Sequence, residues 1–179
     1  TELAQQVIDY DDEINETQHD IDEKCLVLIA TQGPMAGDLR AILSVSNIAA
    51  ELERMGDYTE GIARLAIKLA GQPLIKPLID IPRMAQESRR MLLASLEAFA
   101  REDAKAAWEI GQADDVVDAL YDQVYRELLV FMMEDPRTIL NATYLLWVAH
   151  NLERIADRTT NIAERVIFMD SGEIVDLNR

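Results

Sequence analysis

Two pairs of acidic residues, each spaced Glu-x-x-x-Asp, recur 100 residues apart in this chain. Glu53 and Asp57 form the first pair, and Glu153 and Asp157 form the second. Residues four apart share one face of a helix, so each pair sets two carboxylates side by side. Such neighbours repel by about 0.2–0.5 kcal/mol, where a Glu–Lys pair would attract by as much. The pattern therefore indicates that a positive group lies against each pair.

A second acidic stretch precedes each pair. Asp11 and Asn15 precede the first pair, while Asp114 and Asp118 precede the second. If each stretch and its pair lie on neighbouring helices of an antiparallel hairpin, the flanks that carry these side chains adjoin. We therefore predict two clusters of oxygen ligands. The first acid cluster comprises Asp11, Asn15, Glu53 and Asp57, with Glu60 beside it, and the second acid cluster comprises Asp114, Asp118, Glu153 and Asp157.

Oxygen-rich clusters of this kind are typical of metal sites. The candidate ligands suit Mg²⁺, Ca²⁺, Mn²⁺ and iron, and the lack of cysteine or nearby histidine makes structural zinc a poor fit. The sequence alone does not distinguish iron, manganese, magnesium and zinc. We expect divalent or ferric ions and no enzyme activity, because no nucleophile–base set, glycine-rich phosphate loop or acid–base pair in a pocket is apparent.

Two other functions fit parts of the pattern. A helical adaptor would use the same acidic stripes, without metal, to meet a basic partner surface. A carboxylate-bridged iron oxidase or iron-storage bundle would need two Glu-x-x-His motifs. Only Glu16 and His19 have that spacing, because Trp147 stands three residues before His150. Metal analysis of protein purified without chelator distinguishes the adaptor from a metal-binding protein.

The spacing of apolar residues predicts the helices that position these acids. Each pair lies on a helix with an apolar seam at intervals of three and four residues, formed by Ile48, Leu52, Met55, Thr59, Ile62, Ala66 and Leu69 in the first copy and by Val148, Leu152, Ile155, Thr159, Ile162 and Val166 in the second. The predicted helices span residues 2–31, 36–70, 82–101, 104–134 and 137–169. Breaks are expected at Gly33-Pro34, at the linker containing Pro73, Pro77 and Pro82, and at Asp135-Pro136.

Two further expectations concern the C-terminal tail and the aromatic residues. The polar tail after Gly172 should be loosely held. The aromatic residues concentrated in the second half should lie in the core: Trp108, Tyr121, Tyr125, Phe131, Tyr144 and Trp147.

Composition favours a soluble, all-helical protein. Only 7 Gly and 5 Pro occur among 179 residues, of which 49% are hydrophobic. A net charge of −16 argues against nucleic-acid binding, since the sequence shows no separate basic patch.

Cys25 has no internal disulfide partner and fits a helical face in the core. No stretch is long and apolar enough for a membrane span and no signal peptide opens the chain, so we expect a cytoplasmic protein without direct membrane insertion.

The repeat predicts two domains, residues 1–76 and 77–179. The helix at 82–101 precedes the second copy, but the sequence shows no counterpart before the first. We therefore expect the natural protein to have roughly 20–30 further N-terminal residues, a helix of ordinary length with a connector. Without that helix, much of the seam of Ile48, Leu52, Met55 and Ile62 would lack cover. The first half should then be a hairpin whose open groove is empty, filled by a neighbouring chain or closed by repacking.

The sequence resembles the PhoU family of bacterial phosphate-signalling regulators along nearly its whole length. The resemblance rests on four stretches: Gly37-Asp38-Leu39-Arg40, Glu51-Leu52-Glu53-Arg54-Met55-Gly56-Asp57, Phe131-Met132-Met133-Glu134-Asp135, and Asn151-Leu152-Glu153-Arg154-Ile155-Ala156-Asp157 continued by Asn161-Ile162-Ala163-Glu164. Many members have histidine directly after the motif aspartate, where this chain has Tyr58 and Arg158. Asn15 also stands opposite Asp118, and Gly61 opposite Asn161, so the first cluster is poorer in ligands.

The resemblance implies a function as well as a fold. It implies tandem three-helix bundles with multinuclear metal sites, and repression of the phosphate-starvation response. It also implies partners at the membrane, a phosphate-specific ABC transporter and a sensor histidine kinase. We further expect a homodimer.

Overall fold

The chain folds into a bundle of long helices. The computed structural model describes residues 1–111 and 114–177, in which every regular element is helical. The elements are α1 (Glu2–Gln32), α2 (Gly37–Leu69), α3 (Asp80–Arg101), α4 (Ala104–Gly111), α5 (Asp114–Glu134), the short 3₁₀ helix η1 (Pro136–Thr138) and α6 (Ile139–Ser171). The prediction of an all-helical fold is confirmed, and the long helices begin and end within about two residues of their expected bounds.

The helices begin and end at glycine and aspartate residues that can be recognised in the sequence. Gly33 ends α1 in a left-handed conformation with φ of 57°, which costs a glycine little. The Asp103 side chain caps α4 by accepting a 2.9 Å hydrogen bond from the backbone N–H of Ala106. Asp135 begins the turn into η1. The helix predicted over 104–134 corresponds to α4 and α5, which lie on either side of residues 112–113; that part of the prediction lies outside the described residues.

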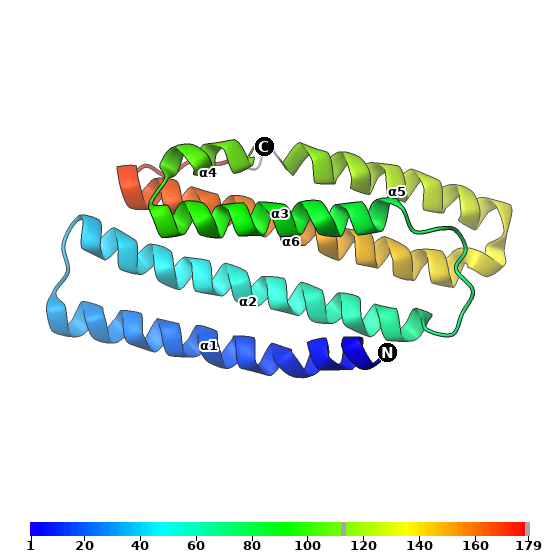
Figure 1. The fold of residues 1–179 in the computed structure, drawn as a ribbon, viewed down its shortest axis with the longest axis horizontal. Coiled ribbons are helices and arrows are strands. Elements are labelled where there is room, and N and C mark those ends of the chain that lie inside the picture. Colours follow the sequence, from blue (N-terminus) through cyan, green and yellow to red (C-terminus); the bar gives the residue numbers. More distant parts are fainter. Residues whose placement is uncertain (112–113, 178–179) are drawn as a thin grey trace.

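The two motif helices, α2 and α6, form the centre of the bundle. They pack more extensively on each other than any other pair of helices. In Figure 1, α1 lies along the outer side of α2, while α3 covers α6 and α4 and α5 line the opposite edge. Ile48 and Met55 of α2 join one hydrophobic core with residues of α3, α5 and α6. The two halves therefore share a core.

The two seams differ in burial. All six seam residues of α6 are buried, including Thr159 and Ile162 with no exposed surface. On α2, Ile48 and Met55 are buried, but the expectation fails for Thr59 and Ala66, which are exposed. The reason is the number of packed neighbours. α3 and α5 both cover α6, whereas α1 is the one helix of the first half that packs along α2.

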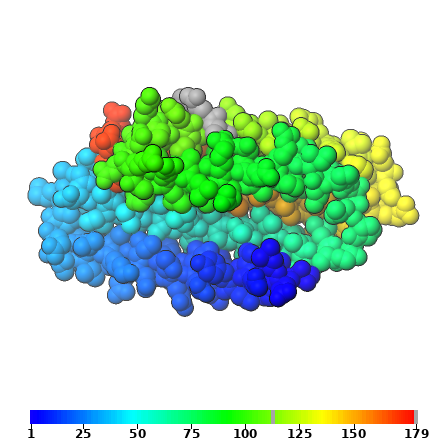
Figure 2. All heavy atoms as spheres, in the orientation of Figure 1, coloured from blue at the N-terminus to red at the C-terminus, as the bar shows by residue number. Residues whose placement is uncertain are grey.

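The first half is a hairpin, as expected. Its predicted groove is partly closed by repacking, because Ile48 and Met55 lie in a core shared with α3, α5 and α6, and the rest of the groove stays open. The groove encloses about 490 Å³ and is lined by Val7, Tyr10 and Ile14 of α1, Leu52 and Met55 of α2, Leu92 of α3 and Ile155 of α6. Figure 2 shows the surface hollowed between α1 and α3, with α2 beneath. The outward position of α1 leaves its apolar residues Leu3, Tyr10 and Leu28 exposed, while Cys25 is buried as expected.

Two expectations about the second half are wrong. Trp108, Tyr125 and Trp147 do not lie in the core, because their side chains are 50%, 42% and 53% exposed. The tail is not loose up to Leu177 either. Val175 and Leu177 pack against a small apolar cluster of α3, α4 and α6, and the Leu177 backbone N–H donates a 2.9 Å hydrogen bond to Glu164 Oε1. None of the described helices is long and apolar enough to cross a membrane.

The burial contrast between the halves predicts unequal costs for the same substitution. Ile162→Ala should lower the free energy of unfolding by about 2–5 kcal/mol, because it opens a cavity in a closed core. Ile62→Ala, at the equivalent position of α2, should cost clearly less, because Ile62 is only partly buried. Urea denaturation of the two variants measures both values, and equal losses would contradict the description of the first half as open.

Candidate functional site

The second acid cluster forms between α5 and α6. Asp114 and Asp118 lie on α5, and Glu153 and Asp157 lie on α6. The four carboxyl groups are close enough to perturb one another, since Asp118 and Asp157 raise the pKa of Asp114 and both also raise that of Glu153. The sequence-predicted residues of this cluster are therefore brought together by the α5–α6 hairpin.

Burial changes the charge state of this cluster. Asp114 is 5% exposed, and loss of hydration is the largest cause that raises its pKa to about 7. Burial, followed by the charge of Asp157, likewise raises the pKa of Glu153 to about 7. The pKa of Asp118 is raised by burial and by Asp157. At neutral pH the cluster therefore holds protons that ordinary carboxyl groups would have released.

The first acid cluster forms between α1 and α2. Burial raises the pKa of Asp11, with further contributions from the nearby Asp57 and Glu60. Burial and Asp57 also raise the pKa of Glu53. Asn15 donates a 3.2 Å hydrogen bond from Nδ2 to Asp11 Oδ2. The predicted residues again come together, and Glu60 joins them. The sequence indicated this, because Glu60 lies seven residues after Glu53 and therefore on the same face of the helix, two turns further along.

Three carboxylate oxygens in these clusters are buried without a hydrogen-bond partner: Asp11 Oδ1, Asp114 Oδ1 and Glu153 Oε2. Glu153 Oε2 lies 3.4 Å from His150 Nδ1, but without hydrogen-bond geometry. An unpaired buried acceptor is costly, and a cation would satisfy it. The donor chemistry of both clusters therefore fits a hard metal ion. As the helices stand, no three Asp, Glu, His or Cys side chains of the described residues converge closely enough to hold one ion.

Positively charged side chains accompany the second acid cluster. Arg154 Nη1 lies 3.2 Å from Asp157 Oδ2, and the Arg154 guanidinium also lies over the Tyr58 ring at 6.0 Å. The corresponding arginine of the first half, Arg54, instead approaches Glu51 at 3.5 Å. The positive charge expected against the Glu-x-x-x-Asp pairs is thus partly supplied by the protein itself in the second half. Sequence reasoning missed this role of Arg154.

Apart from Asn15 on α1, the departures from the family pattern lie at the contact between α2 and α6. Arg158 Nη1 pairs with Glu51 Oε2 at 3.2 Å, and Asn161 Nδ2 donates to the same oxygen at 3.1 Å. Further along α2, Gly61 leaves room for Asn151, whose Nδ2 would lie only 3.0 Å from a Cβ at that position. These residues join the two halves to each other.

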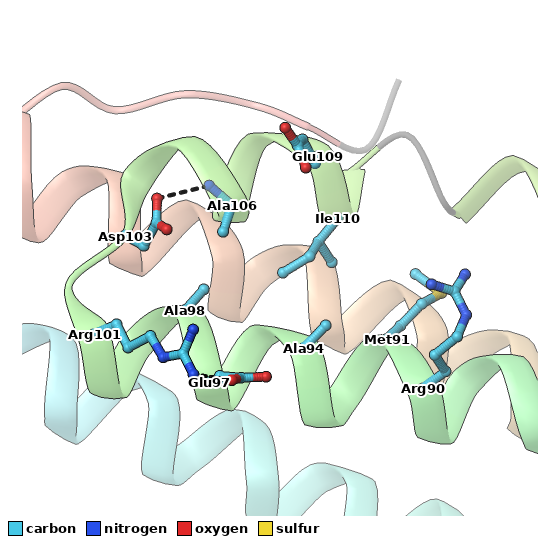
Figure 3. A pocket seen from close by; sticks show the side chains of 10 residues that line it. All are labelled: Arg90, Met91, Ala94, Glu97, Ala98, Arg101, Asp103, Ala106, Glu109 and Ile110. Atoms are coloured by element: carbon cyan, nitrogen blue, oxygen red, sulfur yellow. Dashed lines mark hydrogen bonds and ion pairs between the residues drawn. The ribbon is translucent and has the colours of Figure 1, made fainter.

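A separate cavity of about 280 Å³ lies between α3 and α4 (Figure 3). Its two arginines already have acidic partners, because Arg90 Nε lies 2.8 Å from Glu87 Oε2 and Arg101 Nη2 lies 2.5 Å from Glu97 Oε1. Asp103 is occupied as the cap of α4. This cavity contains no member of either acid cluster, so we do not assign the functional site to it.

The fold and the clusters define a class of protein: an all-helical bundle of two related halves that carries carboxylates between the helices of each hairpin. The chain belongs to the PhoU family. The model of the PhoU domain matches residues 1–66 and again residues 81–166, one segment in each half.

Relatives and solved structures agree with this assignment. A protein of Aquifex aeolicus named phosphate-specific transport system accessory protein PhoU homolog is 44% identical, over 97% of this chain and 79% of its own length. The Pseudomonas aeruginosa protein of the same name is 40% identical over 95% of this chain and 71% of its own. The crystal structure of PhoU from Pseudomonas aeruginosa superposes with a TM-score of 0.91, covering 96% of this chain and 82% of that one. A phosphate transport system regulatory protein PhoU from Streptococcus pneumoniae, 35% identical, gives 0.90 and covers 98% and 82%.

The raised pKa values predict how stability depends on pH when no metal is bound. Because Asp114 and Glu153 hold protons in the folded state up to about pH 7, the folded protein binds more protons than the unfolded chain above about pH 4. Their contribution to the free energy of unfolding is therefore full below about pH 4 and is lost as the pH rises through 7. In chelator-treated protein, Asp114→Asn/Glu153→Gln should flatten this decline and be more stable than the parent at pH 8, by on the order of 1–2 kcal/mol.

The control for this experiment is Asp20→Asn/Glu23→Gln, which neutralises two exposed acids of α1. It should retain the parent's pH dependence. A parent whose chemical denaturation midpoint is constant from pH 5 to pH 8 would contradict the assigned charge state of the second acid cluster.

Proposed function

We propose that this protein is a negative regulator of the phosphate-starvation response that links a phosphate-specific ABC transporter to a sensor histidine kinase. The observation that carries the proposal is family membership along nearly the whole chain, together with relatives whose names assign them to the phosphate transport system. The protein would act at the cytoplasmic face of the membrane through these partners. Its role would be regulatory, without catalysis of its own, and its working form would be a homodimer.

We further propose that both acid clusters bind metal ions. Asp11, Asn15, Glu53 and Asp57 would hold ions in the first half, and Asp114, Asp118, Glu153 and Asp157 would hold them in the second. The support is the set of buried carboxylate oxygens without partners, whose donor type favours iron, manganese or magnesium. A bound cation would supply the missing counter-charge and draw the helices of each hairpin together.

A metal-free adaptor is the second candidate. It is favoured by the Arg154–Asp157 pair, which shows that the chain can neutralise part of a cluster itself, and by the lack of three converging ligands among the described residues. In this alternative, the acidic stripes would bind a basic surface of the partner directly.

Metal analysis separates the two candidates. Protein purified without chelator should contain iron or manganese, and added Mn²⁺ should raise the melting temperature of chelator-treated protein. Glu153→Gln/Asp157→Asn should abolish the metal content of the second half while Asp20→Asn/Glu23→Gln leaves the total content at the parent's value. Metal-free protein whose melting temperature ignores Mn²⁺ and iron would favour the adaptor.

A genetic experiment tests regulation independently of metal. Deleting the gene should switch on phosphate-starvation genes in phosphate-rich medium, and the parent gene should restore repression. Under the metal proposal, the Glu153→Gln/Asp157→Asn gene should restore repression poorly although its protein accumulates normally. Continued repression in the deletion strain would refute the regulatory proposal.

A further inference from the structure

Four aromatic rings form a continuous surface on the α5–α6 hairpin. Tyr121 and Tyr125 of α5 lie with their ring centroids 6.4 Å apart, and the Tyr121 ring lies 6.1 Å from that of His150 on α6. Trp147 meets His150 edge-on at 5.7 Å. We call these four residues the aromatic surface. Its outermost members, Trp147 and Tyr125, are 53% and 42% exposed.

The surroundings of the aromatic surface differ from those of the exposed residues on α1. The apolar residues exposed on α1 belong to a hairpin whose groove lies open. In the second half, by contrast, α3, α5 and α6 all pack together, and the core-facing positions Val117, Val124 and Ile162 are completely or almost completely buried. The aromatic surface therefore remains exposed on the outside of a closed core. Large exposed aromatic groups of this kind mark interaction sites more often than chance.

Acidic side chains border the aromatic surface. Glu153 of the second acid cluster lies 3.4 Å from the His150 ring, and its charge also helps raise the pKa of Tyr121, after burial. Asp122 follows Tyr121 on the exposed side of α5, where it forms an exposed 3.8 Å pair with Arg126. Two acidic side chains and one arginine thus border the aromatic surface, and the protein as a whole has a net charge of −16.

Exposed aromatic rings with acidic side chains at their border favour one kind of binding partner. An arginine guanidinium stacks on aromatic faces and pairs with carboxylates, and apolar neighbours of that arginine would cover the exposed rings of Trp147 and Tyr125. Exposed tryptophan and tyrosine are the residues that most often dominate binding energy at protein interfaces. An anionic lipid surface would instead be repelled by the acidic border and by the net charge.

We propose that the aromatic surface docks an arginine-bearing, apolar segment of the protein's partner in the phosphate transport system. The inference rests on the proposed function and adds to it the location and the chemistry of the contact. Neither acid cluster is required to bind metal for this contact to form.

The chain offers a matched control for the test. Trp108 on α4 is 50% exposed, nearly the same as Trp147, but it is not part of the aromatic surface. Binding of the purified cytoplasmic ATPase subunit of the transporter is measured by calorimetry for the parent, Trp147→Ala, Tyr125→Ala and Trp108→Ala. Trp147→Ala should weaken binding on the order of tenfold or more, Tyr125→Ala should weaken it measurably, and Trp108→Ala should leave it unchanged.

Two further measurements identify the contact. Trp147 is the single tryptophan of a Trp108→Phe variant, and its emission should shift to shorter wavelength when the subunit binds. Replacing surface arginines of the subunit with lysine, one at a time, should reproduce the loss at one position, because lysine lacks the planar group that stacks on a ring. Melting temperatures of the alanine variants within a few degrees of the parent show that lost binding is not lost folding.

Each possible outcome has a distinct meaning. If the parent binds the subunit and Trp147→Ala and Tyr125→Ala bind it equally well, the inference is overturned while the proposed function stands. If the parent does not bind the subunit at all, the transporter link in the proposed function fails, and the inference fails with it. If Trp147→Ala alters only the sedimentation of the protein alone, the aromatic surface is an interface between two copies, which also overturns the inference.

Discussion

The packing of α2 against α6 is the constraint on which the rest of the structure depends. The two motif helices run antiparallel, so that Glu51 meets Asn161 and, further along α2, Gly61 meets Asn151. Between these ends, Tyr58 lies beneath Arg154. Near the C-terminus of α6, Ser44 Oγ donates a 3.2 Å hydrogen bond to the Arg165 carbonyl oxygen and Arg40 Nε donates a 3.4 Å bond to that of Met169. One flank of each motif helix is occupied by this contact. The Glu-x-x-x-Asp residues of each motif helix therefore face the other helix of the same hairpin.

The pairing of Glu51 with Arg158 illustrates why the contact is specific. Both side chains are 15% exposed, so each charge has lost most of its water. Removing Glu51 alone would leave the buried Arg158 charge without this partner, whereas removing Arg158 alone would leave Glu51 with Arg54 and Asn161. The pair therefore fixes how the two halves align more than it contributes net stability. Sequence comparison of the two motif copies gives no sign of it, because Glu51 has Asn151 as its equivalent and Arg158 has Tyr58.

Most of the fold was predictable because local chemistry and periodicity agree. The three- and four-residue spacing marks α1, α2, α3 and α6, and Gly33, Asp103 and Asp135 end or cap helices by interactions within a few residues. Both acid clusters followed from the same spacing plus the assumption of two hairpins. The errors concern burial, which depends on distant neighbours. Nothing near Trp147 in the sequence tells whether another helix covers it, and Leu177 is held by Glu164 and Gly111, residues that become its neighbours only in the folded chain.

Burial also explains why two clusters of similar composition differ in charge state. In the second half, α3 closes the core beneath α5 and α6, and the pKa of the buried Asp114 is raised to about 7. In the first half, Asp11 lies at the edge of an open groove. A buried carboxyl group with an unpaired oxygen destabilises the apo protein, and an apolar residue of similar volume at position 114 would pack at lower cost. Stability therefore does not account for an acid at this position. The bound cation proposed above would supply positive charge here, because Arg154 reaches Asp157 but leaves one oxygen each of Asp114 and Glu153 without a partner.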